Sequence, residues 1–197
     1  RDDKVVNRLI AAKQVLADCA QGRESDRLGL ILFGDAPYLQ APFTGDIDTW
    51  LTLLKESEIG MAGQSTAFGD AIGLSISVFK NTSSGKLSEN QSKNRVLIVL
   101  TDGNDTGSKV PPIEAARIAR AFNIKIHTIA VGLPEGDEQT ALDVDTLQAV
   151  AQVNGGQFFR AESQSDLIQA HEEISRLEPR KYETIAYSPK SQLFYYP

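Results

Sequence analysis

The feature that most constrains the fold is the segment RVLIVLTDG at 95–103, where apolar residues follow one another without alternation before a polar turn. A strand that is apolar on both faces must be covered on both, as in parallel sheets flanked by helices. The segments LGLILF at 28–33 and IKIHTIAVG at 124–132 have the same character. Because ligands of open α/β sheets bind where such strands end, we expect a binding site at that edge.

Helical periodicity fills the intervals between these strands. We expect helices at 4–19, after Asp46 or Asp48, from 67 to 78, from Pro112 to about Asn123, after a cap at Asp145, and from Ser163 to Leu177. Short strands are expected at 38–40, between Pro37 and Pro42, and at 157–161. The pattern predicts an α/β fold with a doubly wound, mostly parallel sheet, one antiparallel edge strand and helices on both faces.

One domain is expected at 1–178, followed by a tail at 179–197. The tail mixes aromatic and basic residues, which is typical of segments at a membrane interface and equally of a tail that packs on its own domain. No apolar stretch reaches the roughly 20 residues that span a bilayer.

Charge and cysteine content exclude several classes of partner. The formal net charge of -6, with no run of Lys or Arg, makes nucleic acid an unsuitable partner. Cys19 is the only cysteine, so the chain holds neither a disulfide framework nor a thiolate zinc site. Its helical spacing predicts a small core residue and not a reactive thiol.

Three segments, in their order and spacing, resemble the von Willebrand factor A (vWA) family: GQSTAFGDAI at 63–72, VLIVLTDGND at 96–105 and IHTIAVG at 126–132. The resemblance implies a metal-ion-dependent adhesion site built from an Asp-x-Ser-x-Ser loop, a threonine and an aspartate. Thr66 and Asp102 match the last two. It also implies Mg²⁺, or Mn²⁺ or Ca²⁺, bound by oxygen ligands, and a protein partner that offers a carboxylate to the metal.

Each of these residues also has a purely structural interpretation. Thr66 can cap a helix, and Asp102 before a glycine can form an Asx turn. The neighbouring polar positions are candidates for outer-sphere or partner contacts, or for plain loop residues: Ser65, Asp70, Gly103, Asn104 and Asp105.

The sequence departs from the family at one point, because no Asp-x-Ser-x-Ser occurs in it. The resemblance places the strand before that loop between LGLILF and RVLIVL. Without it, two strands would face each other across an unbonded slot. We therefore expect the first central strand to come from outside these residues, through an excerpted or processed chain or a swap between protomers.

A narrower resemblance, carried by GMAGQSTAFGDAI at 60–72 and the tail, is to the bacterial aerotolerance (Bat-type) membrane proteins. It implies a protein of the bacterial inner membrane, anchored by segments outside these residues, with a periplasmic domain. The predicted function is thus a cation-dependent protein-interaction module that is not an enzyme.

Two alternatives stay open. One is a metal-free vWA platform for assembly. The other is a serine hydrolase, because GQSTA at 63–67 comes within one glycine of a nucleophile elbow. The elbow requires a strand that leads directly into the turn, whereas 55–62 reads as a helix end and loop. His127 in a strand and His171 in a helix are expected to be structural.

Overall fold

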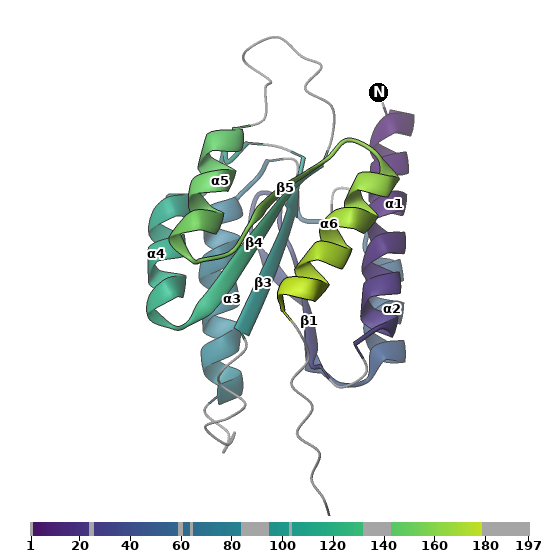
Figure 1. Ribbon diagram of the computed structural model, residues 1–197, viewed down its shortest axis with the longest axis horizontal. Helices are drawn as coiled ribbons and strands as arrows, with labels where there is room; N and C mark the ends of the chain where they lie inside the picture. Colours follow the sequence, from purple (N-terminus) through teal and green to yellow (C-terminus); the bar gives the residue numbers. More distant parts are fainter. Residues whose placement is uncertain are drawn as a thin grey trace, which may run out of the picture.

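The computed structural model describes residues 2–23, 26–58, 61–63, 65–83, 95–102, 104–131 and 143–178. Helices and strands alternate along most of the chain, as the sequence predicts (Figure 1). In chain order they are α1 (Asp2–Gln21), β1 (Leu28–Leu32), β2 (Tyr38–Thr44), α2 (Ile47–Glu56), α3 (Phe68–Ser83), β3 (Arg95–Thr101), α4 (Pro112–Ala121), β4 (Ile124–Val131), α5 (Val144–Val153), β5 (Phe158–Ala161) and α6 (Gln164–Leu177).

The described strands form two sheets. In one, β3, β4 and β5 are parallel and lie in that order. In the other, β1 and β2 are antiparallel. The α/β class, the parallel arrangement and the single antiparallel edge strand are therefore confirmed.

An unpaired edge separates the two sheets, because no hydrogen-bonded ladder joins β1 to β3 among the described strands. The burial of the strands reflects this. In β4, which has a neighbour on each side, every residue from Ile126 to Ala130 is buried. In β3 only Val99 and Thr101 are buried, although its sequence is as apolar. Within the described ranges, LGLILF and RVLIVL thus belong to separate sheets and are not paired with each other, as expected.

Helices cover the sheets on both faces (Figure 1). On one face α3, α4 and α5 contribute to a core with β3 and β4 that includes Phe68, Ile72 and Ile126. On the other, α1 and α6 bury Val15 and Ile174 with parts of β4 and β5. A third cluster packs α1 and α2 against β1 and β2. The ring of Phe79 in α3 also lies 4.9 Å from that of Phe43 in β2, so α1 and α3 each contact both sheets.

Two local details differ from the sequence prediction. Strand β2 continues past Pro42 to Thr44, because the register with β1 shifts in this region and an edge strand tolerates a residue without an N–H. The cap of α5 is Asp143, whose side chain accepts the N–H of Thr146. The expected cap, Asp145, lies inside the first turn instead.

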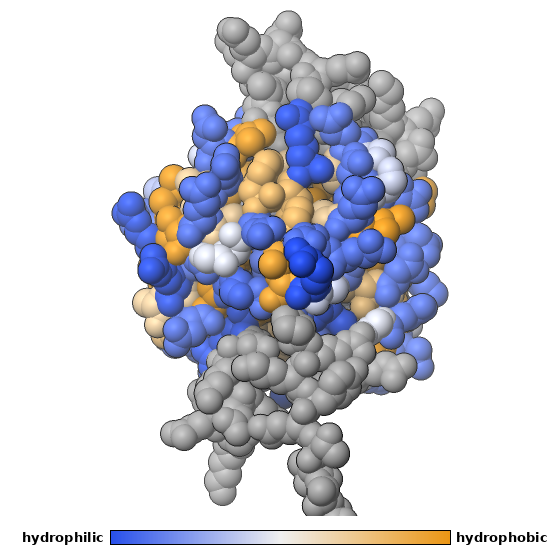
Figure 2. Space-filling model, viewed as in Figure 1, coloured by the Kyte–Doolittle hydropathy of each residue, from blue (hydrophilic) through white to orange (hydrophobic). Residues whose placement is uncertain are grey.

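Hydrophilic side chains predominate on the face shown in Figure 2, and apolar ones form small separate patches there. Within the described ranges no helix is both long and apolar enough to cross a membrane. The tail at 179–197 lies outside the described residues.

Candidate functional site

The structure brings together the two loops that the sequence singled out. Thr66 precedes α3, and Thr106 lies in the loop that follows β3. The N–H of Thr66 donates to Thr106 Oγ1 at 3.1 Å, and the N–H of Thr106 donates to the Thr66 carbonyl at 3.0 Å. The segments at 63–72 and 96–105 therefore meet at the carboxyl edge of the parallel sheet, where the site was predicted.

Asp105 caps α3 from this second loop. Its Oδ1 accepts the N–H of Phe68 at 2.9 Å and that of Gly69 at 3.4 Å. The hydroxyl of Ser108 donates to the same oxygen and accepts the N–H of Gly69 at 2.7 Å. An acidic group at the start of a helix satisfies free N–H groups and opposes the helix dipole. The carboxylate of Asp105 thus joins the two loops.

Asp70, in the first turn of α3, in turn binds the loop that follows β3. Its Oδ1 accepts the N–H groups of Lys109 at 3.1 Å and Val110 at 3.2 Å, just before α4. The backbone of α3 at Gly69 lies so close to that of Val110 that a Cβ on Gly69 would be 2.0 Å from the Val110 carbonyl oxygen. Glycine is required at this position because any side chain would overlap the backbone.

Asp35, which the sequence analysis did not select, holds the same loop from the other side. Its Oδ1 accepts the N–H of Ser65 at 2.8 Å, and its own N–H donates to Ala62 at 2.6 Å. Gly63 has a φ of +99°, and a Cβ there would lie 2.1 Å from the Asp35 carboxyl carbon. The available signal was its position after an apolar strand, a context that it shares with Asp102.

The backbone N–H groups from Ser65 to Gly69 are all occupied. The acceptors, in that order, are Asp35 Oδ1, Thr106 Oγ1, the Gly34 carbonyl, Asp105 Oδ1, and Ser108 Oγ with Asp105 Oδ1. A helix start with free N–H groups attracts anions. The N–H groups at these positions all have acceptors within the protein, so they are not available to an anion.

Thr66 does not cap α3 through its side chain, because Asp105 fills that role. Among the described residues no atom forms a hydrogen bond with Thr66 Oγ1. Asp102 directly follows β3 and is exposed. Both residues offer oxygen atoms of the kind that hard cations prefer.

The remaining predicted positions have different surroundings. Asn104 Oδ1 accepts the N–H of Asp143, so the loop after β3 also contacts the cap of α5. Ser65 Oγ faces Gly107, where a Cβ would lie 3.1 Å away. Gly103 lies outside the described residues.

In the described part of the chain, no group of three or more His, Cys, Asp or Glu residues is arranged to hold a metal ion. Thr66 and Asp102 therefore fit a hard cation in chemistry but supply only part of a coordination shell.

His127 lies in the core of the domain, and both of its ring nitrogens have partners there. His127 is 1% exposed, and its Nδ1 accepts the N–H of Gln157 at 3.1 Å. The proton is thereby placed on Nε2, which lies 3.1 Å from Glu178 Oε1. Burial lowers the pKa of His127 despite this carboxylate. The interpretation of His127 as a satisfied core histidine is confirmed.

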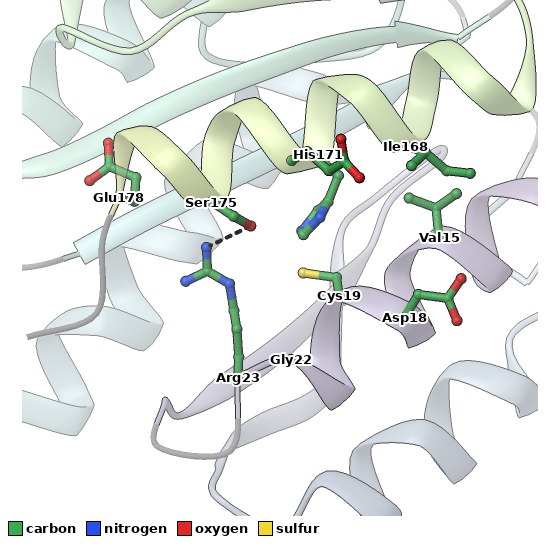
Figure 3. Close-up of a pocket in the computed structure, with 10 residues that line it drawn as sticks. Val15, Asp18, Cys19, Gly22, Arg23, Ile168, His171, Ser175 and Glu178 are labelled. Carbon is green, nitrogen blue, oxygen red and sulfur yellow. Dashed lines mark hydrogen bonds between the residues drawn. The ribbon is translucent and has the colours of Figure 1, made fainter. Parts of the chain in front are cut away.

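A groove of about 270 Å³ lies between α1 and α6, away from the carboxyl edge (Figure 3). Cys19 and His171 point toward each other across it, and Arg23 donates to Ser175 at 3.3 Å. Cys19 is half-buried and not fully in the core, and burial raises the pKa of its thiol. Neither histidine forms a hydrogen bond with Ser65 in the described residues, so the Ser–His contact of a hydrolase is not formed there.

The fold and the loops at its carboxyl edge define a doubly wound α/β domain of the vWA class. The sequence pattern of the von Willebrand factor type A domain matches residues 1–173. The chain belongs to this family.

Two bacterial proteins with solved structures are similar to this chain over most of its length. BatB from Bacteroides thetaiotaomicron, a conserved hypothetical protein, is 26% identical with a TM-score of 0.68, and the match covers 86% of this chain and 87% of that one. An aerotolerance-related membrane protein from Bacteroides fragilis is 22% identical with a TM-score of 0.70, covering 85% and 86%. The Bat-type resemblance is therefore confirmed.

Two further relatives differ more in length. Proximal thread matrix protein 1 from the mussel byssus, described with a zinc-occupied MIDAS (metal-ion-dependent adhesion site) motif, shares the fold at 19% identity and a TM-score of 0.62. That match covers 85% of this chain and 39% of the mussel chain. A Borreliella burgdorferi protein described as uncharacterized is 27% identical over 129 residues, which are 66% of this chain and 36% of that protein.

Proposed function

We propose that this domain binds a protein partner through a divalent cation held at the carboxyl edge of the sheet, with Thr66 and Asp102 as two of its ligands. The observation that carries the proposal is the occupied series of N–H groups from Ser65 to Gly69. With these donors used internally, the loop is suited to a cation and unsuited to an anion.

The cation is proposed to be Mg²⁺, with Mn²⁺ or Ca²⁺ as substitutes, because both ligands are hard oxygen donors. The zinc-occupied motif of the mussel protein supports a divalent cation in this fold and leaves the choice of ion to experiment. The remaining ligands would come from an Asp-x-Ser-x-Ser loop after a strand that pairs between β1 and β3. The lack of a ladder between β1 and β3 among the described strands supports this origin.

A partner carboxylate is the proposed last ligand. A bound divalent ion that keeps an open coordination position can take a carboxylate oxygen from another protein, which makes recognition depend on the cation. The other polar groups of the two loops would then hold the ligands in place or contact the partner.

The domain is proposed to face the periplasm from the bacterial inner membrane, with its anchor outside the described residues. Support comes from the description of the Bacteroides fragilis protein as an aerotolerance-related membrane protein. Protease accessibility in intact cells and in spheroplasts tests this. Digestion in spheroplasts alone is expected, and protection in both would place the domain in the cytoplasm.

Calorimetry with Mg²⁺ and Mn²⁺ tests the cation proposal on a longer chain that supplies the first strand. We expect binding by that chain, and at least a tenfold loss, or about 1.4 kcal/mol, in both Thr66→Val and Asp102→Asn. Thr52→Val is the matched control, because the Thr52 hydroxyl donates to the Asp48 carbonyl on α2.

Absence of cation binding by the longer chain would sink the proposal and favour the metal-free platform. Turnover of an ester that a serine-directed inhibitor abolishes would instead favour the hydrolase alternative.

A further inference from the structure

We propose that Thr106 is the positioning residue for Thr66, and that it sets the cation affinity of the site without contacting the cation. This inference rests on the proposed function. Both backbone polar groups of Thr66 bind this one residue: its N–H donates to Thr106 Oγ1 at 3.1 Å, and its carbonyl accepts the Thr106 N–H at 3.0 Å. The pair fixes the peptide groups on both sides of the Thr66 Cα, and so limits where its hydroxyl can lie.

Thr106 is itself held on both sides. Its predecessor, Asp105, binds the first N–H groups of α3. Its successor, Gly107, lies so close to Ser65 that a Cβ would come within 3.1 Å of the serine oxygen. Thr106 therefore cannot shift relative to Thr66 without disturbing the contacts of both neighbours.

The same loop begins with Asp102, directly after β3. Thr106 thus connects the loop that carries one proposed ligand to the residue that carries the other. Residues that orient metal ligands typically change metal affinity by about 10- to 100-fold when they are removed. Thr106 has the position to do so across two loops that are 40 residues apart in sequence.

A substitution at Thr106 can test the positioning role without changing the charge of the site. Its hydroxyl oxygen already accepts a hydrogen bond from Thr66, and the side chain carries no charge. Removing the hydroxyl therefore leaves the charge near the cation unchanged. Asp35 and Asp105 also hold this loop, but their replacement would alter the local negative charge as well.

The test compares Thr106→Val, which keeps the shape and removes the acceptor, with Thr106→Ser, which keeps the acceptor. Both are made in the longer chain that supplies the first strand, with Thr52→Val as the control for loss of an exposed threonine hydroxyl. Two quantities are measured: Mg²⁺ and Mn²⁺ affinity by calorimetry, and the hydrogen exchange rate of the Thr66 amide by NMR without cation.

We expect Thr106→Val to weaken cation binding on the order of tenfold and to speed exchange of the Thr66 amide. Thr106→Ser and Thr52→Val should bind like the unmodified chain. Unchanged affinity in Thr106→Val, or equal weakening in Thr106→Ser, would overturn the positioning role.

A different result identifies failure of the proposed function itself. If the unmodified longer chain binds neither cation, the cation role of both threonines is wrong. Faster exchange at Thr66 in Thr106→Val would then report the backbone contact alone.

Discussion

The carboxylate of Asp105 accepts the backbone N–H of Phe68 at 2.9 Å, so a residue 37 positions further along the chain caps the start of α3. Because it also accepts from Gly69, its loss leaves more than one N–H without this partner. We expect Asp105→Ala to lower the free energy of unfolding by about 1–2 kcal/mol, measured by urea denaturation.

Asp145→Ala is the matched control for this cap. Asp145 lies in the first turn of α5, where Asp143 already supplies the capping oxygen. Its replacement should remove only a favourable interaction with the helix dipole, worth a few tenths of a kcal/mol. Equal losses in the two variants would show that Asp105 contributes charge and not a specific cap.

The edge that carries the candidate site was predictable in part, because local pattern identifies buried parallel strands. The apolar runs at 95–101 and 124–131 required burial on both faces, and the ends of parallel strands lie at one edge of a sheet. That placed Asp102, directly after the first run, at this edge, whereas Thr66 precedes a helix and was assigned to the same edge by the vWA resemblance.

The contacts that hold those residues were not predictable from local pattern. Asp35 binds Ser65 and Thr106 binds Thr66 across separations of 30 and 40 residues. Such pairs depend on how loops meet after the sheet forms, and any polar loop residue is compatible with them beforehand. The same uncertainty put the cap of α5 at Asp145 when the neighbouring acid Asp143 takes that position.

Burial of His127 makes stability depend on pH. Burial lowers the pKa of this imidazole from its ordinary value of 6.5 and outweighs the Glu178 carboxylate. As pH falls, the unfolded chain therefore binds a proton at His127 before the folded chain does. The stabilising contribution is complete above about pH 6.5 and is lost as pH falls through the lower folded pKa.

We expect the free energy of unfolding to fall between pH 7 and 5, by at most about 1.4 kcal/mol per pH unit for each such histidine. His171 contributes in the same direction, because burial also lowers its pKa. Urea denaturation across this range should give a shallower slope for His127→Gln and for His171→Gln. A slope that neither variant reduces would assign the effect to other groups.

The thiol of Cys19 should react slowly in the folded protein. Burial raises its pKa, while the Arg23 guanidinium acts in the opposite direction. Because the thiolate is the reactive form, we expect iodoacetamide to label Cys19 more slowly in the native chain than in urea. Arg23→Met should slow native labelling further.

Arg27→Met is the control for this experiment, because Arg27 instead donates to the Phe43 carbonyl at 3.0 Å. In Arg27→Met, Cys19 should be labelled at the same rate as in the unmodified chain. Faster labelling of Arg23→Met would mean that Arg23 acts mainly by shielding the groove and not through its charge.

The slot between β1 and β3 should be visible in hydrogen exchange. Successive residues of a strand in a parallel sheet direct their N–H groups alternately toward its two neighbours. Strand β4 is paired on both sides from Thr128 to Ala130, whereas β3 pairs with β4 alone among the described strands. In the 197-residue chain we therefore expect protection at every position of β4 from Thr128 to Ala130 and at only alternate positions of β3.

Supplying the first strand, in a longer chain, should slow the remaining β3 amides by at least about tenfold, because each gains a ladder hydrogen bond. Strand β5 serves as the internal control: among the described strands it pairs with β4 alone, and its exchange pattern should not change. Uniform protection of β3 in the shorter chain would mean that its edge is already covered. The first strand would then have no vacant ladder to join, and the proposed source of the remaining cation ligands would be wrong.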